Sequence, residues 1–207
     1  MNDDYQILCY GDSNTWGYIP LSGERFPRRQ RWPGVMAEHL GAGFHVIEEG
    51  LSGRTTVWED PLEPHRNGLS YLPACLMSHK PLDLVILMLG TNDLKARFSQ
   101  LASDIALGAE RLVEVIQGSQ CGRDGRAPAI LLAAPPPIVL KPGEDMFLGG
   151  DAKSAAFAQG YAAVAQRNGC AFFDVGRVIA VDEPDGIHYS AESHRTLGLA
   201  MAEMVKV

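Results

Sequence analysis

The stretch LDLVILMLGTND, residues 82–93, joins a short apolar run to a turn of small and polar residues. An apolar run of this length is typical of a strand that is covered on both faces of a sheet. Comparable runs recur along the chain as QILCY (6–10), FHVIEE (44–49), AILLAA (129–134) and AFFDV (171–175). We therefore expect a five-stranded sheet built from these segments.

Helical patterns separate these runs, at residues 30–40, 69–79, 99–117, 151–168 and 190–206. Asp151 and Ser190 are expected to cap the N-termini of the helices at 151–168 and 190–206. Gly118 is expected to end the helix at 99–117, and Gly169 the helix at 151–168. Alternating strands and helices predict a parallel sheet with helices on both faces. A length of 207 residues suits one domain over 1–207.

Composition narrows the classes of partner. The formal net charge of −7 argues against nucleic acid or an anionic membrane, because both select basic surfaces. No stretch approaches the roughly 20 apolar residues of a membrane span. The polar start MNDDYQ predicts no signal peptide, and Cys9, Cys75, Cys121 and Cys170 lack C-x-x-C spacing. We expect free, mostly buried thiols and a cytoplasmic protein.

Polar segments follow four of the predicted strands or their connectors. They are GDSN (11–14), GLSGR (50–54), GTND (90–93) and DGIH (185–188). In open parallel sheets, ligands bind outside the carboxyl ends of the strands. The four segments are therefore expected to converge on one edge of the sheet.

Together these segments contain a set of groups for acyl transfer. A serine nucleophile needs a base, a group that orients the base, and donors for the oxyanion. Asp185 and His188 are three residues apart, so the carboxylate can meet one imidazole nitrogen while the other faces Ser13. The backbone N–H groups of Ser13 and Gly53 and the side-chain amide of Asn92 are the predicted oxyanion donors.

Each piece also has a purely structural interpretation. Asp12-Ser13 is a good helix N-cap pair, Asn92-Asp93 is a common Asx turn, and a single His188 is more often a hydrogen-bonded structural residue. A glycine in the second segment can simply relieve a turn, and Gly50 is an alternative donor to Gly53. The convergence of all four segments favours catalysis over these separate explanations.

The blocks at 11–13, 50–53, 90–93 and 185–188 resemble the SGNH (GDSL-type) hydrolase family. The segments VIEEGLSGRTT, LDLVILMLGTND and DGIHYS are similar to those of the bacterial arylesterase and acyltransferase branch of this family. The resemblance implies the flavodoxin-like SGNH hydrolase fold, a three-layer α/β/α sandwich with a five-stranded parallel sheet. It also implies a triad of Ser13, Asp185 and His188 and an oxyanion hole from Ser13, Gly53 and Asn92. It also implies that no metal or organic cofactor is needed.

Residues around the serine carry further expectations. Asn14 stands where the family motif has leucine, and we expect it to bind substrate at the edge of the site. Trp16 is expected to wall the substrate pocket or, alternatively, to pack in the core. Asp12 should anchor the serine turn, and Arg54 should pair with Asp93 or, alternatively, hold a substrate.

These observations predict a serine esterase that acts on small aryl or short-chain acyl esters, with water, an alcohol or hydrogen peroxide as the acceptor. A carbohydrate acetylesterase is the main alternative within the enzymes, and a lysophospholipase or thioesterase a weaker one. A non-catalytic flavodoxin-like binding module is the alternative outside them. Segments 17–29 and 135–150 are long and rich in apolar residues, which predicts a homo-oligomer or a lid that folds back on a monomer.

Overall fold

The computed structural model describes residues 4–181 and 184–206. Within them, one five-stranded sheet forms the centre, with all strands parallel in the order β2-β1-β3-β4-β5. The strands are β1 (Tyr5–Gly11), β2 (Phe44–Gly50), β3 (Leu84–Met88), β4 (Ala129–Ala134) and β5 (Ala171–Asp174). The predicted parallel sheet is confirmed, although β3 is shorter than its apolar run, and Leu82 forms an isolated bridge with Gly122.

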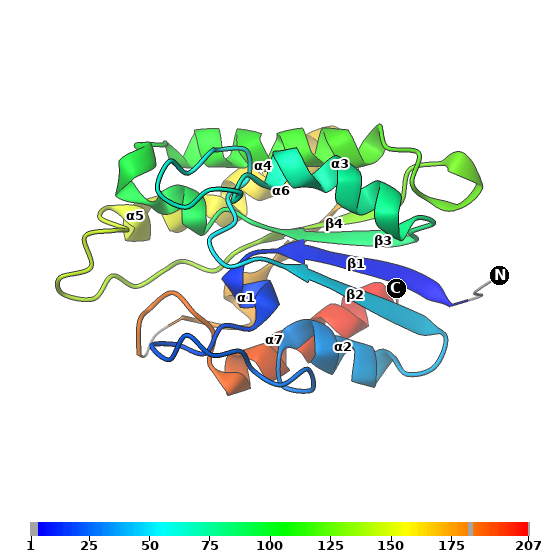
Figure 1. Ribbon diagram of the computed structural model, residues 1–207, viewed down its shortest axis with the longest axis horizontal. Helices are drawn as coiled ribbons and strands as arrows, with labels where there is room; N and C mark the ends of the chain where they lie inside the picture. The colour runs from blue at the N-terminus through cyan, green and yellow to red at the C-terminus, as the bar shows by residue number, and fades with distance from the viewer. Residues whose placement is uncertain (1–3, 182–183, 207) are drawn as a thin grey trace.

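Helices cover the sheet on both faces, which confirms the three layers (Figure 1). One layer consists of α2 (Trp32–Leu40) and α7 (Ala191–Val205). The opposite layer consists of α3 (Gly68–His79), α4 (Ala102–Gln117) and α6 (Phe157–Asn168).

The strands read as unbroken apolar runs because successive side chains enter different cores. Ile7 and Cys9 are buried in the core beneath α2 and α7, while Leu8 and Tyr10 are buried in the core beneath α3, α4 and α6. Burying one such side chain stabilises the fold by about 1.5–3 kcal/mol relative to leaving it exposed. Both faces of a central strand must therefore be apolar.

Two of the predicted helix ends illustrate how local signals succeed and fail. The Ser190 hydroxyl accepts the N–H of Ser193 at 3.1 Å, as expected of an N-cap. The predicted cap at Asp151 is wrong, because the segment divides into α5 (Gly150–Ser154) and α6 and Asp151 lies inside α5. The Ser154 hydroxyl accepts the N–H of Ile138 at 3.0 Å, a tertiary contact that holds α5 against the preceding loop.

Short helices occupy the connections. They are α1 (Ser13–Trp16) and the 3₁₀ turns η1 (Asn92–Leu94), η2 (Ala96–Phe98), η3 (Arg123–Gly125) and η4 (Val175–Arg177). Both α1 and η1 start directly beyond the carboxyl ends of β1 and β3. The chain order reverses between these two neighbouring strands, and such a switch point leaves a crevice where ligands bind.

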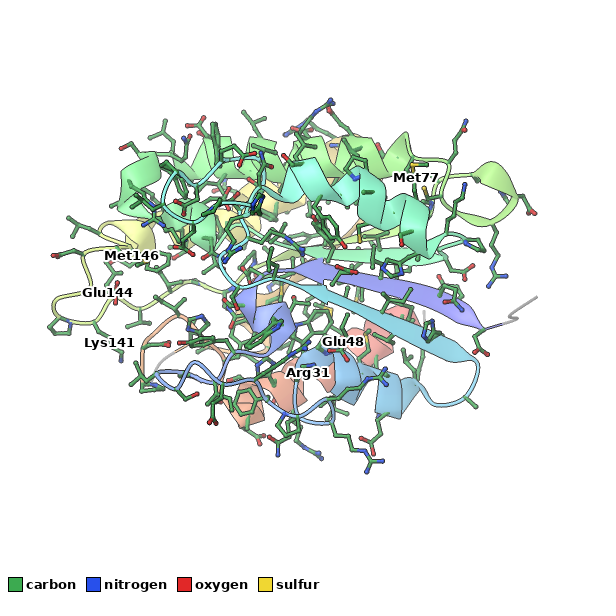
Figure 2. The ribbon with its side chains drawn as sticks, viewed as in Figure 1. Arg31, Glu48, Met77, Lys141, Glu144 and Met146 are labelled. Carbon is green, nitrogen blue, oxygen red and sulfur yellow. The ribbon has the colours of Figure 1, made fainter. Side chains whose placement is uncertain are left out.

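The long loop after β4 is only partly buried. Figure 2 shows Lys141, Glu144 and Met146 along its outer course between β4 and α5. Within the same loop, Ile138 and Phe147 are buried in the core. Some of the apolar residues therefore fold back as a lid would, while Val139, Met146 and Leu148 lie exposed.

The cysteines agree with the sequence analysis, since all four are free thiols and Cys9, Cys75 and Cys121 are buried. In the described part of the chain, none of the helices combines the length and the apolar character needed to cross a bilayer.

Candidate active site

Ser13 is the first residue of α1, immediately beyond β1. The Asp12 carboxylate accepts the N–H of Asn14 at 2.9 Å, so Asp12 caps the helix and anchors the serine turn as expected. Gly17 closes the turn with a left-handed φ of 89° and donates its N–H to the Ser13 carbonyl at 2.8 Å. The capping interpretation and the nucleophile interpretation are therefore compatible, because the cap is what fixes the position of the hydroxyl.

Ser13, His188 and Asp185 form a continuous hydrogen-bonded chain. The Nε2 of His188 lies 3.0 Å from the Ser13 hydroxyl, and its Nδ1 lies 2.8 Å from Oδ2 of Asp185. The other carboxylate oxygen of Asp185 accepts the N–H groups of Ile187 at 2.9 Å and of His188 at 2.8 Å. The three-residue spacing thus folds the carboxylate back onto its own loop and aligns the imidazole.

The surroundings of Asp185 favour the ionised form of its carboxyl group. Burial raises the pKa of Asp185, but hydrogen bonds from the His188 ring and from two backbone N–H groups outweigh burial and lower the pKa to about 2. An ionised Asp185 favours a proton on Nδ1 of His188. Nε2 is then free to accept the proton of the Ser13 hydroxyl.

Two further buried carboxyl groups, Asp12 and Asp93, lie beneath the site. Burial raises the pKa of Asp12 to about 6 and that of Asp93 to about 7, although local hydrogen bonds oppose the shift in both cases. The charge of Asp12 raises the pKa of Asp93 further. Asp93 accepts the N–H of Thr56 at 3.0 Å and also its hydroxyl, so it ties the segment after β2 to the turn after β3.

The predicted pairing of Arg54 with Asp93 is wrong. The Arg54 guanidinium donates to the backbone carbonyls of Gly11, at 2.8 Å, and of Glu49, and it lies 4.2 Å from the centre of the Tyr10 ring. The Gly11 carbonyl also accepts the N–H of Leu51 at 3.1 Å, so Arg54 adds a second donor there. Arg54 thereby links the ends of β1 and β2 and holds the loop that carries Gly53.

Two of the predicted oxyanion donors, Gly53 and Asn92, lie on segments that contact each other. Gly53 has a φ of 83°, a conformation that favours glycine. The side-chain nitrogen of Asn92 donates to the Arg54 carbonyl at 3.1 Å, which places the amide beside the residue that follows Gly53. Within the described residues, the backbone N–H groups of Ser13 and Gly53 donate to no protein acceptor. This leaves both groups able to bind an anionic oxygen.

Asn14 was predicted to bind substrate, but its contacts point to a different use. Its side-chain nitrogen donates to the Ile187 carbonyl at 3.2 Å, and its oxygen accepts the N–H of Tyr189 at 3.1 Å. Both ends of the amide therefore hold the backbone on either side of His188. The side chain is buried, so Asn14 connects the serine turn to the histidine loop.

Aromatic residues border the histidine. The ring of Tyr18 lies 4.3 Å from that of His188, a contact that the sequence analysis did not identify beyond noting the apolar character of segment 17–29. Trp16 is half-buried, and the Arg25 guanidinium lies 5.0 Å from its ring. This partial burial is compatible with both predicted places for Trp16, the pocket wall and the core.

Comparison with known proteins adds an independent line of evidence. The model of the GDSL-like Lipase/Acylhydrolase family matches residues 9–196. The structure of an aryl esterase from M. smegmatis superimposes with a TM-score of 0.94 at 48% identity, covering 98% of both chains. A carbohydrate acetylesterase from Sinorhizobium meliloti, Est24, gives a TM-score of 0.94 at 46% identity, covering 98% of this chain and 99% of its own.

A more distant relative comes from curated sequences. An acetylxylan esterase of Xylanibacter ruminicola is 28% identical over 142 residues, which is 67% of this chain. The match covers only 28% of the length of that relative.

Proposed function

The chain belongs to the GDSL-like lipase/acylhydrolase family, which makes it a carboxylic ester hydrolase, and from this premise we propose that it cleaves small acyl esters through an acyl-enzyme on Ser13. The observation that carries this proposal is the unbroken chain from Asp185 through His188 to the Ser13 hydroxyl. A hydroxyl alone is a weak nucleophile, and this chain supplies the base and its orientation.

In the first step, the Ser13 oxygen attacks the ester carbonyl carbon while Nε2 of His188 takes the hydroxyl proton. The resulting imidazolium is stabilised by the ionised Asp185 at 2.8 Å. Negative charge develops on the former carbonyl oxygen, and the N–H groups of Ser13 and Gly53 and the amide of Asn92 stabilise it. These donors are held by the surrounding backbone, so little reorganisation is needed when the charge forms.

In the second step, His188 returns the proton to the leaving alcohol, and the acyl group stays on Ser13. Water then loses a proton to His188 and attacks the acyl carbon. Collapse of this second intermediate releases the carboxylic acid, and the proton on His188 returns to the Ser13 oxygen.

Covalent labelling tests the nucleophile directly. A fluorescent alkyl phosphonate should label the native protein and should not label Ser13→Ala. Ser52→Ala is the matched control, because Ser52 lies in a neighbouring loop and is not part of the chain of hydrogen bonds. Labelling that survives in Ser13→Ala would exclude this serine as the nucleophile, and a native protein without label would support a binding module.

The substrate class has two candidates. Small aryl or short-chain acyl esters are the first, and acetylated carbohydrates the second, favoured by the 46% identical relative described as a carbohydrate acetylesterase. Parallel assays of p-nitrophenyl esters of graded chain length and of acetylated sugars separate them. Higher kcat/KM on acetylated sugars would support the second candidate.

Acyl transfer to an acceptor other than water is a further part of the proposal. An alcohol that replaces water in the second step gives a new ester, and hydrogen peroxide gives a peracid by the same exchange. Half-buried Tyr18 supplies apolar surface next to the triad that can favour an alcohol over water, and Trp16 adds to it if its ring lines the pocket wall. With vinyl acetate and benzyl alcohol, gas chromatography should detect benzyl acetate, whereas acetate alone would identify a plain hydrolase.

We also propose that the protein is a cytoplasmic homo-oligomer. The exposed Val139, Met146 and Leu148 support association, and the free cysteines support a reducing compartment. Light scattering should give a mass well above 22.4 kDa. The monomer mass over a wide concentration range would favour the lid instead.

A further inference from the structure

A second cluster of reactive side chains lies where α3 crosses the end of the edge strand β2. It consists of Glu49, Cys75 and His79, which each offer one ligand atom, and these atoms lie within 4.8 Å of one another. Nε2 of His79 is already 2.9 Å from Oε1 of Glu49. None of the three belongs to the hydrogen-bonded chain of Ser13.

The sequence explains why these side chains meet. Cys75 and His79 are four residues apart on α3, so both lie on the same face of the helix. Glu49 is the penultimate residue of β2, which is the edge strand beneath this helix. Tyr71, one turn before Cys75, lines a cavity of about 530 Å³ together with Glu49. Of the three side chains, Glu49 is therefore the one that borders this cavity.

Burial differs among the three donors in a way that suits an ion. Cys75 is fully buried, whereas the side chains of Glu49 and His79 are 20% and 29% exposed. An ion can enter between the two exposed donors and meet the thiol on the inner side. The remaining coordination position would then hold water.

The donor set selects the type of ion. Calcium and magnesium take oxygen ligands almost exclusively, whereas thiolate and imidazole favour zinc and related transition metals. Zinc bonds of about 2.0–2.3 Å in a tetrahedral arrangement separate neighbouring ligand atoms by about 3.3–3.8 Å. Donors within 4.8 Å reach these separations by small side-chain rotations. We propose that Glu49, Cys75 and His79 bind Zn²⁺.

Binding has a definite proton balance and a definite structural effect. The Cys75 thiol releases its proton to solvent, whereas neutral His79 keeps its single ring proton on Nδ1 and binds the metal through Nε2. The ion joins α3 to the end of β2, just before the loop that carries Gly53. Zinc should therefore raise the melting temperature, and this effect requires no change in ester chemistry.

Cobalt(II) tests the site, because a bound thiolate gives an intense near-ultraviolet charge-transfer band. We expect this band at one cobalt per chain, with loss of the band when Zn²⁺ is added. Cys75→Ser should abolish the band, and His79→Gln should weaken binding at least tenfold, since even indirect partners of a metal ligand cost about 10–100-fold. The native protein with no thiolate band would overturn the proposal.

Two matched controls separate this site from general metal binding. His39 makes the same contact with Glu203, also at 2.9 Å, but has no neighbouring thiol in that pair, so His39→Gln should leave cobalt binding unchanged. Cys121→Ser removes another buried thiol and should also have no effect.

His79→Gln guards against misfolding, because His79 is partly exposed, and circular dichroism checks its fold. A band of native affinity in folded His79→Gln would overturn the proposal. The readout does not use esterase activity, so its failure would leave the proposed function intact.

Discussion

Asp185 and Asp60 are two carboxylates whose pKa values are lowered by the same kind of interaction, but whose hydrogen-bond partners differ. Burial alone raises the pKa of each, and hydrogen bonds from cationic or polar partners reverse the effect and lower it. Asp185 passes its hydrogen bond through His188 to the Ser13 hydroxyl. Asp60 instead accepts from Lys95 at 3.1 Å and from Arg97.

Asp60, Glu63, Lys95 and Arg97 form one network in which each carboxylate contacts both cations. Lys95 and Arg97 each donate to Glu63 as well, at 2.8 Å and 2.9 Å. Every charge therefore meets an opposite charge, and the network joins the loop after β2 to the turns after β3. The comparison teaches that a lowered pKa identifies a carboxylate held by donors, whereas function depends on where the chain of hydrogen bonds ends.

The sharpest test of this contrast sets Ser13→Ala against Asp60→Asn. Removing the nucleophile should lower kcat by at least about 10⁴-fold, because only binding and the oxyanion hole remain. Asp60→Asn should instead lower the free energy of unfolding and leave kcat of the folded protein near the native value. Turnover of p-nitrophenyl acetate and urea unfolding measure both. Near-native turnover in Ser13→Ala would remove the basis for the distinction.

Asn92 tests the oxyanion side of the same site. Asn92→Ala should lower kcat by about 10²–10³-fold with a smaller change in KM, because the amide meets charge that develops in the transition state. Steady-state kinetics on one short-chain ester gives both constants. If KM rises while kcat is unchanged, Asn92 binds the ground state of the substrate instead.

Lys95→Met tests the network around Asp60. The Lys95 side chain is almost fully buried, and removing it deprives Asp60 of one of its two cations, so we expect a loss of about 3 kcal/mol of unfolding free energy. Arg111→Met is the matched control, since Arg111 pairs with Glu114 at 2.8 Å, as Lys95 does with Glu63, but on an exposed helix face. That variant should change stability by less than about 1 kcal/mol. Equal losses would mean that burial does not distinguish the two pairs.

The pH dependence of stability gives the smallest effect. The pKa of Asp185 is about 2 in the folded protein, against the ordinary value of 3.8. Its contribution to stability is therefore complete above about pH 4 and is lost as the pH falls through about 2. Asp185→Asn should reduce the loss of unfolding free energy at acidic pH, as measured by urea unfolding at a series of pH values. An unchanged loss in the variant would assign the acid sensitivity to other carboxylates.

The contribution of Asp12 to stability has the opposite dependence on pH. Its pKa is raised to about 6, so the stability that it contributes is present below about pH 4 and is lost as the pH rises through about 6. Asp12→Asn should reduce this loss on the neutral side. The two variants together therefore separate a carboxylate held by donors from one that is mainly desolvated.

The sequence predicts the central strands well because both of their faces are buried, and a fully buried apolar run such as 84–88 is typical of a central strand. It also indicates which loops meet, since strand ends of a parallel sheet share an edge. It does not predict Arg54, whose partners are backbone carbonyl groups that every residue type carries. Asn14 is similar, because its partners lie 173 and 175 residues away and nothing local distinguishes a clamp from a pocket residue.

Gly11 and Gly50 are neighbours in register at the ends of β1 and β2. A methyl group on Gly11 would collide with Thr15, and one on Gly50 would collide with the backbone of Trp16, so α1 rests directly on these strand ends. In a mutational scan read out by activity, both positions should therefore be as intolerant as the triad, although neither offers a functional group. Substitutions at these two positions fail because the serine turn fills the space that a side chain would need. A scan read out by protein abundance should therefore show losses at Gly11 and Gly50, whereas substitutions of the triad residues should change abundance less.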